Sequence, residues 1–285
     1  MQSAFWSNTI WYILLAVTSI ISLVLILYKS NNRKFIIGFS LSVLGVTFFA
    51  ETCLLTLSNA YRYFPKISSD PFLDSIIGNY FSQFSITTTA VLTTVFKLTT
   101  IWNFIFAATY YFIEESFLKI GIYQHIWYKS WFTFIAVLLM LWVVKRWYYY
   151  LRGYSPKYIY YLSLFAGASA LFSITIVFFI YAFSIQVINI NFNLEFFRDQ
   201  AILIVSYRSI LIAIMIILYW LKLKWMLNGV SFAFLFMFQY VLTQIDLITI
   251  KDGLFSIVTL VNLFGAYFSV VSVDYLLSKG TANNQ

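Results

Sequence analysis

The sequence predicts an all-α fold, a polytopic transmembrane helix bundle that forms a single integral membrane domain over residues 1–285. Hydrophobic residues make up 62% of the chain and charged residues 10%, a balance that excludes an ordinary water-soluble surface. Apolar runs of about 20 residues, the length a helix needs to cross the hydrocarbon core, recur along the chain. Charged residues gather between these runs. We therefore expect the lipid bilayer to be the main partner.

The apolar runs predict nine spans, with eight as the alternative. Lys97 divides the long run after residue 80 into two spans; a re-entrant pair there would leave the topology elsewhere unchanged. Asp70-Pro71 is typical of an N-cap followed by a first-turn proline and predicts a short interfacial helix near 70–78. The run at 10–28 has no basic residue before it, which argues against a signal peptide. The expected bounds are approximately 10–28, 35–57, 80–96, 98–118, 126–144, 158–185, 200–221, 230–247 and 254–276.

The basic residues predict the orientation. Connections on one side of the expected bundle carry eleven of them and connections on the other side carry six. The positive-inside rule then places the N-terminus outside and the C-terminus in the cytoplasm. The richer side holds Lys29, Arg33, Lys34, Lys97, Lys145, Arg146, Arg152, Lys157, Lys222, Lys224 and Lys279, and the other side holds Arg62, Lys66, Lys119, Lys129, Arg198 and Lys251.

Two groups of small residues predict close helix contacts. Gly38, Ser42 and Gly45 recur three to four residues apart in the second span, and Ala166 to Ala170 form a cluster in the sixth. Such residues let helix backbones approach closely in lipid. No periodic internal repeat is evident in the residue pattern.

Glu51 and Arg208 are the main candidates for a polar site. Each lies inside an apolar run, where a charge without a partner costs roughly 2.5–3.5 kcal/mol on insertion scales. Their expected depths match in the outer half of the bundle, so we predict that they pair. The pair would either form a binding or gating site, or act as a buried strut that fixes helix register.

A polar stripe on the third span extends this candidate site. Gln83, Thr87 and Lys97 fall near one helical face and would suit a water-lined route. Hydroxyls in membrane helices also bond to carbonyls one turn earlier, and that structural role is the favoured alternative.

A second candidate cluster lies at the outer turn after the fourth span. Glu114, Glu115 and His125 could bind a metal or exchange protons. Their spacing matches no metal motif, and an interfacial anchor with the neighbouring tryptophans is the simpler interpretation.

No recognised catalytic or cofactor motif appears in the sequence: it has no phosphate loop, dinucleotide fingerprint, HExxH or serine nucleophile elbow. We therefore predict no catalytic residues, no cofactor, no metal and no nucleic acid partner. The leading hypothesis is transport or recognition of a small solute. The alternative is a structural or accessory component that acts through a membrane protein partner or as a homo-oligomer, and an intramembrane enzyme is the third.

Three segments carry a resemblance to a known group of proteins. They read AYRYFPK over 60–66, DPFLDSIIGNYFSQ over 70–83 and GIYQHIW over 121–127. Over roughly residues 35–150 the chain resembles uncharacterised multi-pass membrane proteins of Gram-positive, spore-forming bacteria. The resemblance implies a bacterial cell membrane as the location, and it supplies no activity to transfer.

Overall fold

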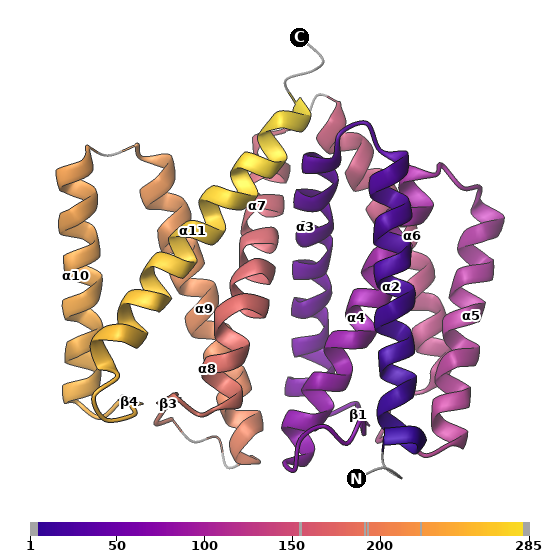
Figure 1. Cartoon of the computed structure of the whole chain (residues 1–285), viewed down its shortest axis with the longest axis horizontal. Coiled ribbons are helices and arrows are strands. Elements are labelled where there is room, and N and C mark those ends of the chain that lie inside the picture. Colours follow the sequence, from indigo (N-terminus) through magenta and orange to yellow (C-terminus); the bar gives the residue numbers. More distant parts are fainter. Residues whose placement is uncertain (1–4, 154–155, 191, 193, 223, 282–285) are drawn as a thin grey trace.

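Nine helical rods stand side by side in the computed structural model (Figure 1). The structure describes residues 5–153, 156–190, 192, 194–222 and 224–281, with the backbone alone at 225 and 279–281. Within these residues, seven helices are long and apolar enough to cross a membrane. Two more polar helices, α4 and α5, contain 25 and 20 residues. The architecture is that of a helical integral membrane protein, and the crossing of all nine rods stays a prediction.

The chain divides into an N-terminal helix and two runs of elements. The N-terminal rod joins a π-helical turn, Phe5–Thr9, to α2, Ile10–Lys29. The first run contains α3 (Arg33–Glu51), a π-helical turn (Thr52–Leu57), β1 (Tyr61–Tyr63), α4 (Pro71–Val95), α5 (Thr100–Lys119), β2 (Tyr123–His125) and α6 (Ser130–Arg152). The second contains α7 (Lys157–Phe172), a π-helical turn (Ser173–Val177), α8 (Phe178–Ala182), β3 (Gln186–Ile188), α9 (Phe196–Trp220), α10 (Trp225–Gln244), β4 (Ile248–Ile250) and α11 (Phe255–Thr281).

Four short strands, absent from the all-α prediction, form two antiparallel pairs. Tyr61 of β1 lies opposite His125 of β2, and Gln186 of β3 lies opposite Ile250 of β4. Both pairs lie at the same end of the bundle, called the strand end below (Figure 1). The positive-inside rule predicts that this end faces outward.

The two runs are internal repeats, which the residue pattern did not reveal. From the first strand onward, each element of the second run begins 125 residues after its counterpart, as for Pro71 and Phe196, or Ser130 and Phe255. Each repeat has four helical rods, an even number, so both repeats run through the bundle in the same direction. This is the relation of parallel repeats about an axis along the membrane normal.

Individual hydrogen bonds recur at corresponding positions of the two repeats. Tyr63 N donates to Ser75 Oγ at 2.9 Å, and the corresponding Ile188 N donates to Gln200 Oε1 at 3.0 Å. The turns agree as well, because positive φ angles recur at matching positions. The matching pairs are Asn59 with Ser184, Lys97 with Lys222 and Gly121 with Asp246.

The expected interfacial helix near 70–78 and the expected span 80–96 are one continuous helix, α4. Its predicted start is confirmed, since Asp70 Oδ1 accepts from Phe72 N at 2.9 Å and Leu73 N at 2.8 Å. The polar residues after it do not end the helix. Asn79 Oδ1 accepts from Gln83 Nε2 at 3.3 Å one turn later, so its amide is satisfied within the protein rather than at an interface.

Other boundaries differ because the loops form structure of their own. The expected span 126–144 begins only at Ser130, since the N–H groups of Ile126, Trp127 and Tyr128 donate to Ala60 O at 3.0–3.3 Å. The expected span 230–247 ends at Gln244 because β4 follows. The expected spans 35–57 and 158–185 each contain a π-helical turn.

The predicted small-residue contact is confirmed between α3 and α7, the first helices of the two repeats. A Cβ atom added at Gly45 would lie 1.9 Å from Ala166 O, and one at Gly167 would lie 3.1 Å from Ser42 Oγ. Ser42 Oγ also donates to Ser163 O at 2.8 Å. The repeats therefore meet backbone to backbone along this contact.

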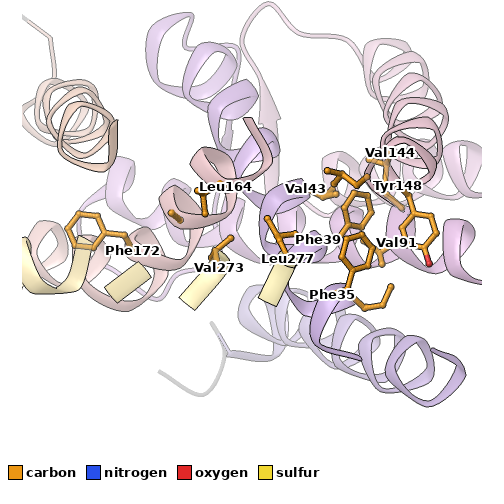
Figure 2. Close-up of a cluster of buried hydrophobic side chains, with 14 of the residues drawn as sticks. Phe35, Phe39, Val43, Val91, Val144, Tyr148, Leu164, Phe172, Val273 and Leu277 are labelled. Carbon is orange, nitrogen blue, oxygen red and sulfur yellow. The ribbon is translucent and has the colours of Figure 1, made fainter. Parts of the chain in front are cut away.

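Buried apolar side chains extend from this contact toward the end opposite the strands. Phe39 of α3 stacks against Phe35 and contacts Trp147 and Tyr148 of α6 at centroid distances of 5.4–6.1 Å. Figure 2 shows this cluster, to which α4, α7 and α11 also contribute.

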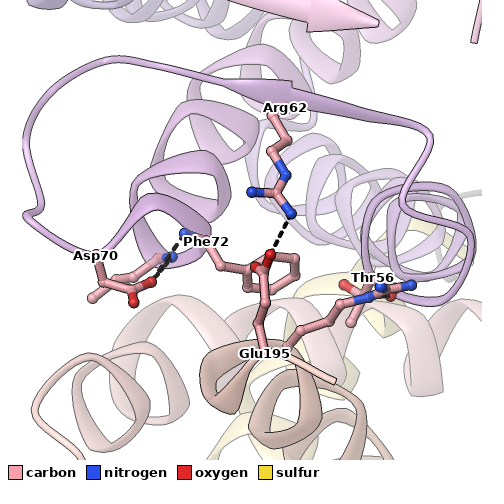
Figure 3. Close-up of polar contacts among 7 residues, drawn as sticks. Thr56, Arg62, Asp70, Phe72 and Glu195 are labelled. Atoms are coloured by element: carbon pink, nitrogen blue, oxygen red, sulfur yellow. Dashed lines mark hydrogen bonds and ion pairs between the residues drawn. The ribbon is translucent and has the colours of Figure 1, made fainter. Parts of the chain in front are cut away.

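Polar contacts join the repeats at the strand end. Arg62, the central residue of β1, forms an ion pair with Glu195, the N-cap of α9, at 2.5 Å (Figure 3). Arg198 donates to Thr56 O at 2.7 Å and to Leu57 O at 2.8 Å, which satisfies carbonyls at the end of a π-helical turn. These bonds fix the second repeat against the first around the site described next.

Candidate functional site

Glu51 is the last residue of α3 and lies next to a π-helical turn, a feature often found at functional sites. Its carboxylate is partly buried and both oxygens are bonded. Oε2 accepts from the Tyr61 hydroxyl, and Oε1 accepts from Gln83 Nε2 at 2.7 Å. Gln83, one of the candidate binding or gating residues, therefore lies beside Glu51.

The predicted ion pair between Glu51 and Arg208 is wrong. Among the described residues, ion pairs within 4.0 Å join Arg62 to Glu195 and His125 to Glu114, and neither involves these two side chains. Glu51 instead accepts hydrogen bonds from two neutral donors, Tyr61 and Gln83, because β1 places Tyr61 against the end of α3. The two residues do line one cavity, as their similar depth in the bundle suggests, but their charged atoms do not meet.

Four tyrosines surround the carboxylate at the strand end. Tyr61 lies 4.9 Å from Tyr128 and 5.3 Å from Tyr123, and Tyr63 lies 4.8 Å from Tyr123, between ring centroids. Burial, followed by the charge of Glu51, raises the pKa of the Tyr61 phenol well above its usual range. Tyr61 therefore stays protonated and acts as a hydrogen-bond donor.

The second predicted cluster belongs to the same place. Glu114 Oε1 lies 2.7 Å from His125 Nε2, and Glu114 Oε2 accepts from the Thr133 hydroxyl. The β2 strand brings His125 to the end of α5, which sequence spacing alone did not show. In the described part of the chain, no three His, Cys, Asp or Glu side chains are grouped to hold a metal.

A cavity of about 340 Å³ joins these two clusters inside the first repeat. Its polar end is formed by Glu51, Gln83, Glu114 and the tyrosines. Its remaining walls are apolar and include Val137, Met140 and Trp147. An apolar cavity with a few converging polar groups is the usual form of a small-molecule site.

The cavity lies between α3 and α6, since side chains of both helices line it. In the second repeat, α11 packs along α7 and fills the corresponding space. Gly265 of α11 lies against the end of α7 and the π-helical turn after it, since a Cβ there would lie 3.4 Å from Phe172 Cε2 and 2.0 Å from Ile176 Cδ1. The corresponding residue of α6 is Met140, which lines the cavity.

Arg208 lies on α9 at the position that corresponds to Gln83 on α4. Its side chain is 4% exposed, and Nη1 donates to Ser173 Oγ at the start of a π-helical turn. The guanidinium also stacks over Phe49 at 5.2 Å from the ring centroid. Nε and Nη2 are buried, and neither has a hydrogen-bond partner among the residues that the structure describes.

A second cavity, of about 80 Å³, lies between the repeats and is lined by both Glu51 and Arg208. Its walls come from corresponding elements: α3, α4 and a π-helical turn on one side, and α8, α9 and a π-helical turn on the other. Glu51 also lines the larger cavity, so one residue borders both spaces.

The remaining predicted residues lie away from the cavities. Thr87 is buried on α4, and no partner for its hydroxyl is found among the described residues. Neighbouring hydroxyls bond to carbonyls one turn earlier, as Thr94 does to Ala90 O at 2.8 Å, which matches the structural interpretation of the stripe. Lys97 is exposed in the turn after α4, and Glu115 is partly exposed beside Glu114.

Sequence reasoning missed the tyrosines and Ser173. The alternation Tyr61-Arg62-Tyr63 is typical of a short strand with two side chains on one face, and this is the signal that could have found the tyrosines. Nothing in the local sequence of Ser173 marks it, since its role depends on contact with a helix 35 residues away. Comparison with family models, curated proteins and solved structures finds no match to this chain.

Proposed function

We propose that this protein recognises a small solute and passes it through the polar site at the strand end of the bundle. The observation that carries the proposal is that Glu51 lines two internal cavities. A carboxylate that served only as a strut would be sealed in a dry ion pair. A carboxylate beside open internal space is available to a ligand or to water.

The chemistry of the larger cavity indicates the kind of solute. Two carboxylates and several tyrosines favour a group that donates hydrogen bonds or carries positive charge. The apolar walls favour a hydrocarbon portion. Leu139 and Val143 of α6 line the cavity and are 58% and 44% exposed, which supports entry between α3 and α6.

The membrane location is part of the same proposal. The positive-inside rule supports an outward-facing strand end, and the resemblance of residues 35–150 supports a bacterial cytoplasmic membrane. A solute would then meet the polar site from the outer half of the bilayer.

Cysteine labelling tests whether the cavity is open to small molecules. Ser82 lines the larger cavity, and Ala90 on the same helix is fully buried away from it. In a background with Cys53→Ser, which removes the single native cysteine, we expect S82C to react with 2-aminoethyl methanethiosulfonate much faster than A90C.

The sign of the reagent probes the acidic end. The cationic reagent should modify S82C faster than the anionic 2-sulfonatoethyl analogue, and Glu51→Gln should reduce that preference. Equal and very slow labelling of S82C and A90C would show a sealed interior and overturn the proposal.

A role through a protein partner is the second candidate. It is favoured by α10, of whose most apolar stretch only 6% is buried within the chain. Lipid covers such a helix equally well. Cross-linking of cysteines at Phe234 on α10 in native membranes would support a partner or second copy, and monomeric protein under those conditions would count against it.

A further inference from the structure

We propose that the cavity between the repeats is an oxyanion site, in which the free edge of Arg208 binds the carboxylate or phosphate group of a small solute. The proposal rests on the proposed function, since it assumes that the strand-end site takes a ligand. It adds the chemistry of the group that is bound and the residue that binds it.

Arg208 carries a charge that the described residues leave unpaired. A buried charge without a partner is costly, so buried arginines are normally paired with acids. Here one edge of the guanidinium is bonded to Ser173 and one face is covered by Phe49, and no carboxylate oxygen of the described part of the chain lies within 4.0 Å. These interactions occupy one face and one edge of the Arg208 guanidinium and leave its second edge, Nε and Nη2, without a partner among the described residues.

The free edge has the geometry that oxyanions require. The N–H groups of Nε and Nη2 lie on the same edge of the planar guanidinium and point in parallel, so they form a fork of two donors. Carboxylates and phosphates bind such a fork through two parallel hydrogen bonds. Arg208 lines a cavity of about 80 Å³, which exceeds the roughly 10–15 Å³ needed for one water several times over.

The internal repeat supplies an independent argument. At the corresponding position of the first repeat, Gln83 donates to the carboxylate of Glu51 at 2.7 Å. In the second repeat, no carboxylate of the described residues bonds to Arg208 in this way. In the first repeat, the carboxylate of Glu51 is the oxyanion bound by Gln83. In the second repeat, Arg208 is a stronger donor than Gln83, but the corresponding oxyanion is missing from the described residues.

The test measures thermal unfolding of the purified full chain with increasing sodium acetate, glycine or inorganic phosphate, at constant ionic strength set by sodium chloride. A saturable rise in unfolding temperature with at least one probe is expected. A response to acetate or glycine identifies a carboxylate site, and a response to phosphate alone identifies a phosphate site. No saturable rise with any of the three overturns the proposal.

Variants assign the effect to the free edge. R208Q should weaken the response by about tenfold or more, because it removes charge-assisted hydrogen bonds. It should still fold, because a buried charge is removed. R208K keeps the charge and loses the fork, so it should also bind weakly. R146Q, at an exposed arginine of α6, removes the same charge elsewhere and should bind as wild type.

The outcomes separate this proposal from the previous one. Wild-type affinity in R208Q, or an equal loss in R146Q, would overturn the oxyanion site. If S82C labels rapidly while no anion binds, the solute proposal stands and this one fails. If anions bind through Arg208 while S82C is unreactive, the oxyanion site is established without the larger cavity.

Discussion

Gln83 of α4 and Arg208 of α9 occupy corresponding positions in the two repeats, and each bonds to a side chain beside a π-helical turn of its own repeat. Gln83 donates to Glu51, the residue before the turn at Thr52–Leu57. Arg208 donates to Ser173, the first residue of the turn at Ser173–Val177. The same arrangement thus contains a carboxylate, Glu51, in the first repeat and a guanidinium, Arg208, in the second, and both residues line the smaller cavity.

The Glu51–Gln83 bond should contribute to stability in a way that a double-mutant cycle can measure. Q83L leaves a buried carboxylate oxygen without its donor and should lower the free energy of unfolding by about 1–3 kcal/mol. In an E51L background the same change should cost less, with a coupling energy of about 0.5–3 kcal/mol. Additive costs in unfolding by denaturant would show that the bond contributes nothing.

The contact between α3 and α7 should not tolerate a methyl group. G45A places Cβ 1.9 Å from Ala166 O, and we expect a loss of about 1–3 kcal/mol or more from overpacking. The control is G229A on α10, where an added Cβ would meet no described atom within 4 Å apart from the adjoining backbone of its own helix; it should be neutral or stabilise by up to about 1 kcal/mol. Thermal unfolding of both variants checks this, and similar values would contradict the close contact.

The loop before α4 should depend on one buried carboxylate. Asp74 accepts from Lys66 N, Ile67 N and Ser68 N at 2.7–2.9 Å and is 4% exposed. D74A leaves these donors unpaired and should cost at least about 1.5–3 kcal/mol, whereas D252A in an exposed turn should change stability little. Faster amide exchange confined to residues 66–68 in D74A would support the mechanism; unchanged exchange would refute it.

Alkaline pH should destabilise the strand end. Desolvation by burial raises the pKa of Tyr128 from 10.0 to about 12. Between those values the unfolded phenol loses its proton and the folded one keeps it, so stability falls as pH rises, by up to about 1.4 kcal/mol per pH unit. Y128F should flatten this part of the profile of stability against pH, and a profile identical to wild type would contradict the shift.

The orientation can be tested with an impermeant thiol reagent in intact cells. In a Cys53→Ser background, S68C at the strand end should react and S30C at the other end should not, because positive residues are retained in the cytoplasm. Lysed cells provide the control in which both positions become accessible. The reverse pattern in intact cells would invert the orientation.

The sequence alone determined the membrane class, the approximate places of the helices and two packing features. The length and hydropathy of a run are enough to predict a helix, because an apolar segment in lipid must form its backbone hydrogen bonds within itself. The cap at Asp70 was predictable because it depends only on residues close in sequence. The contact through Gly45 was predictable because it depends on small residue size. Gln83 was selected from the polar stripe on its helix, and its contact with Glu51 comes from the structure.

Only the tertiary structure decided what those residues contact. The duplication is invisible in the residue pattern because few identities survive at the 125-residue spacing, while backbone turns and loop bonds persist. Depth along a helix does not specify rotation about its axis, so it could not show that Glu51 faces Tyr61 and Gln83 while Arg208 faces Ser173. The cavities between helices arise from that packing, because they depend on which helices fail to touch.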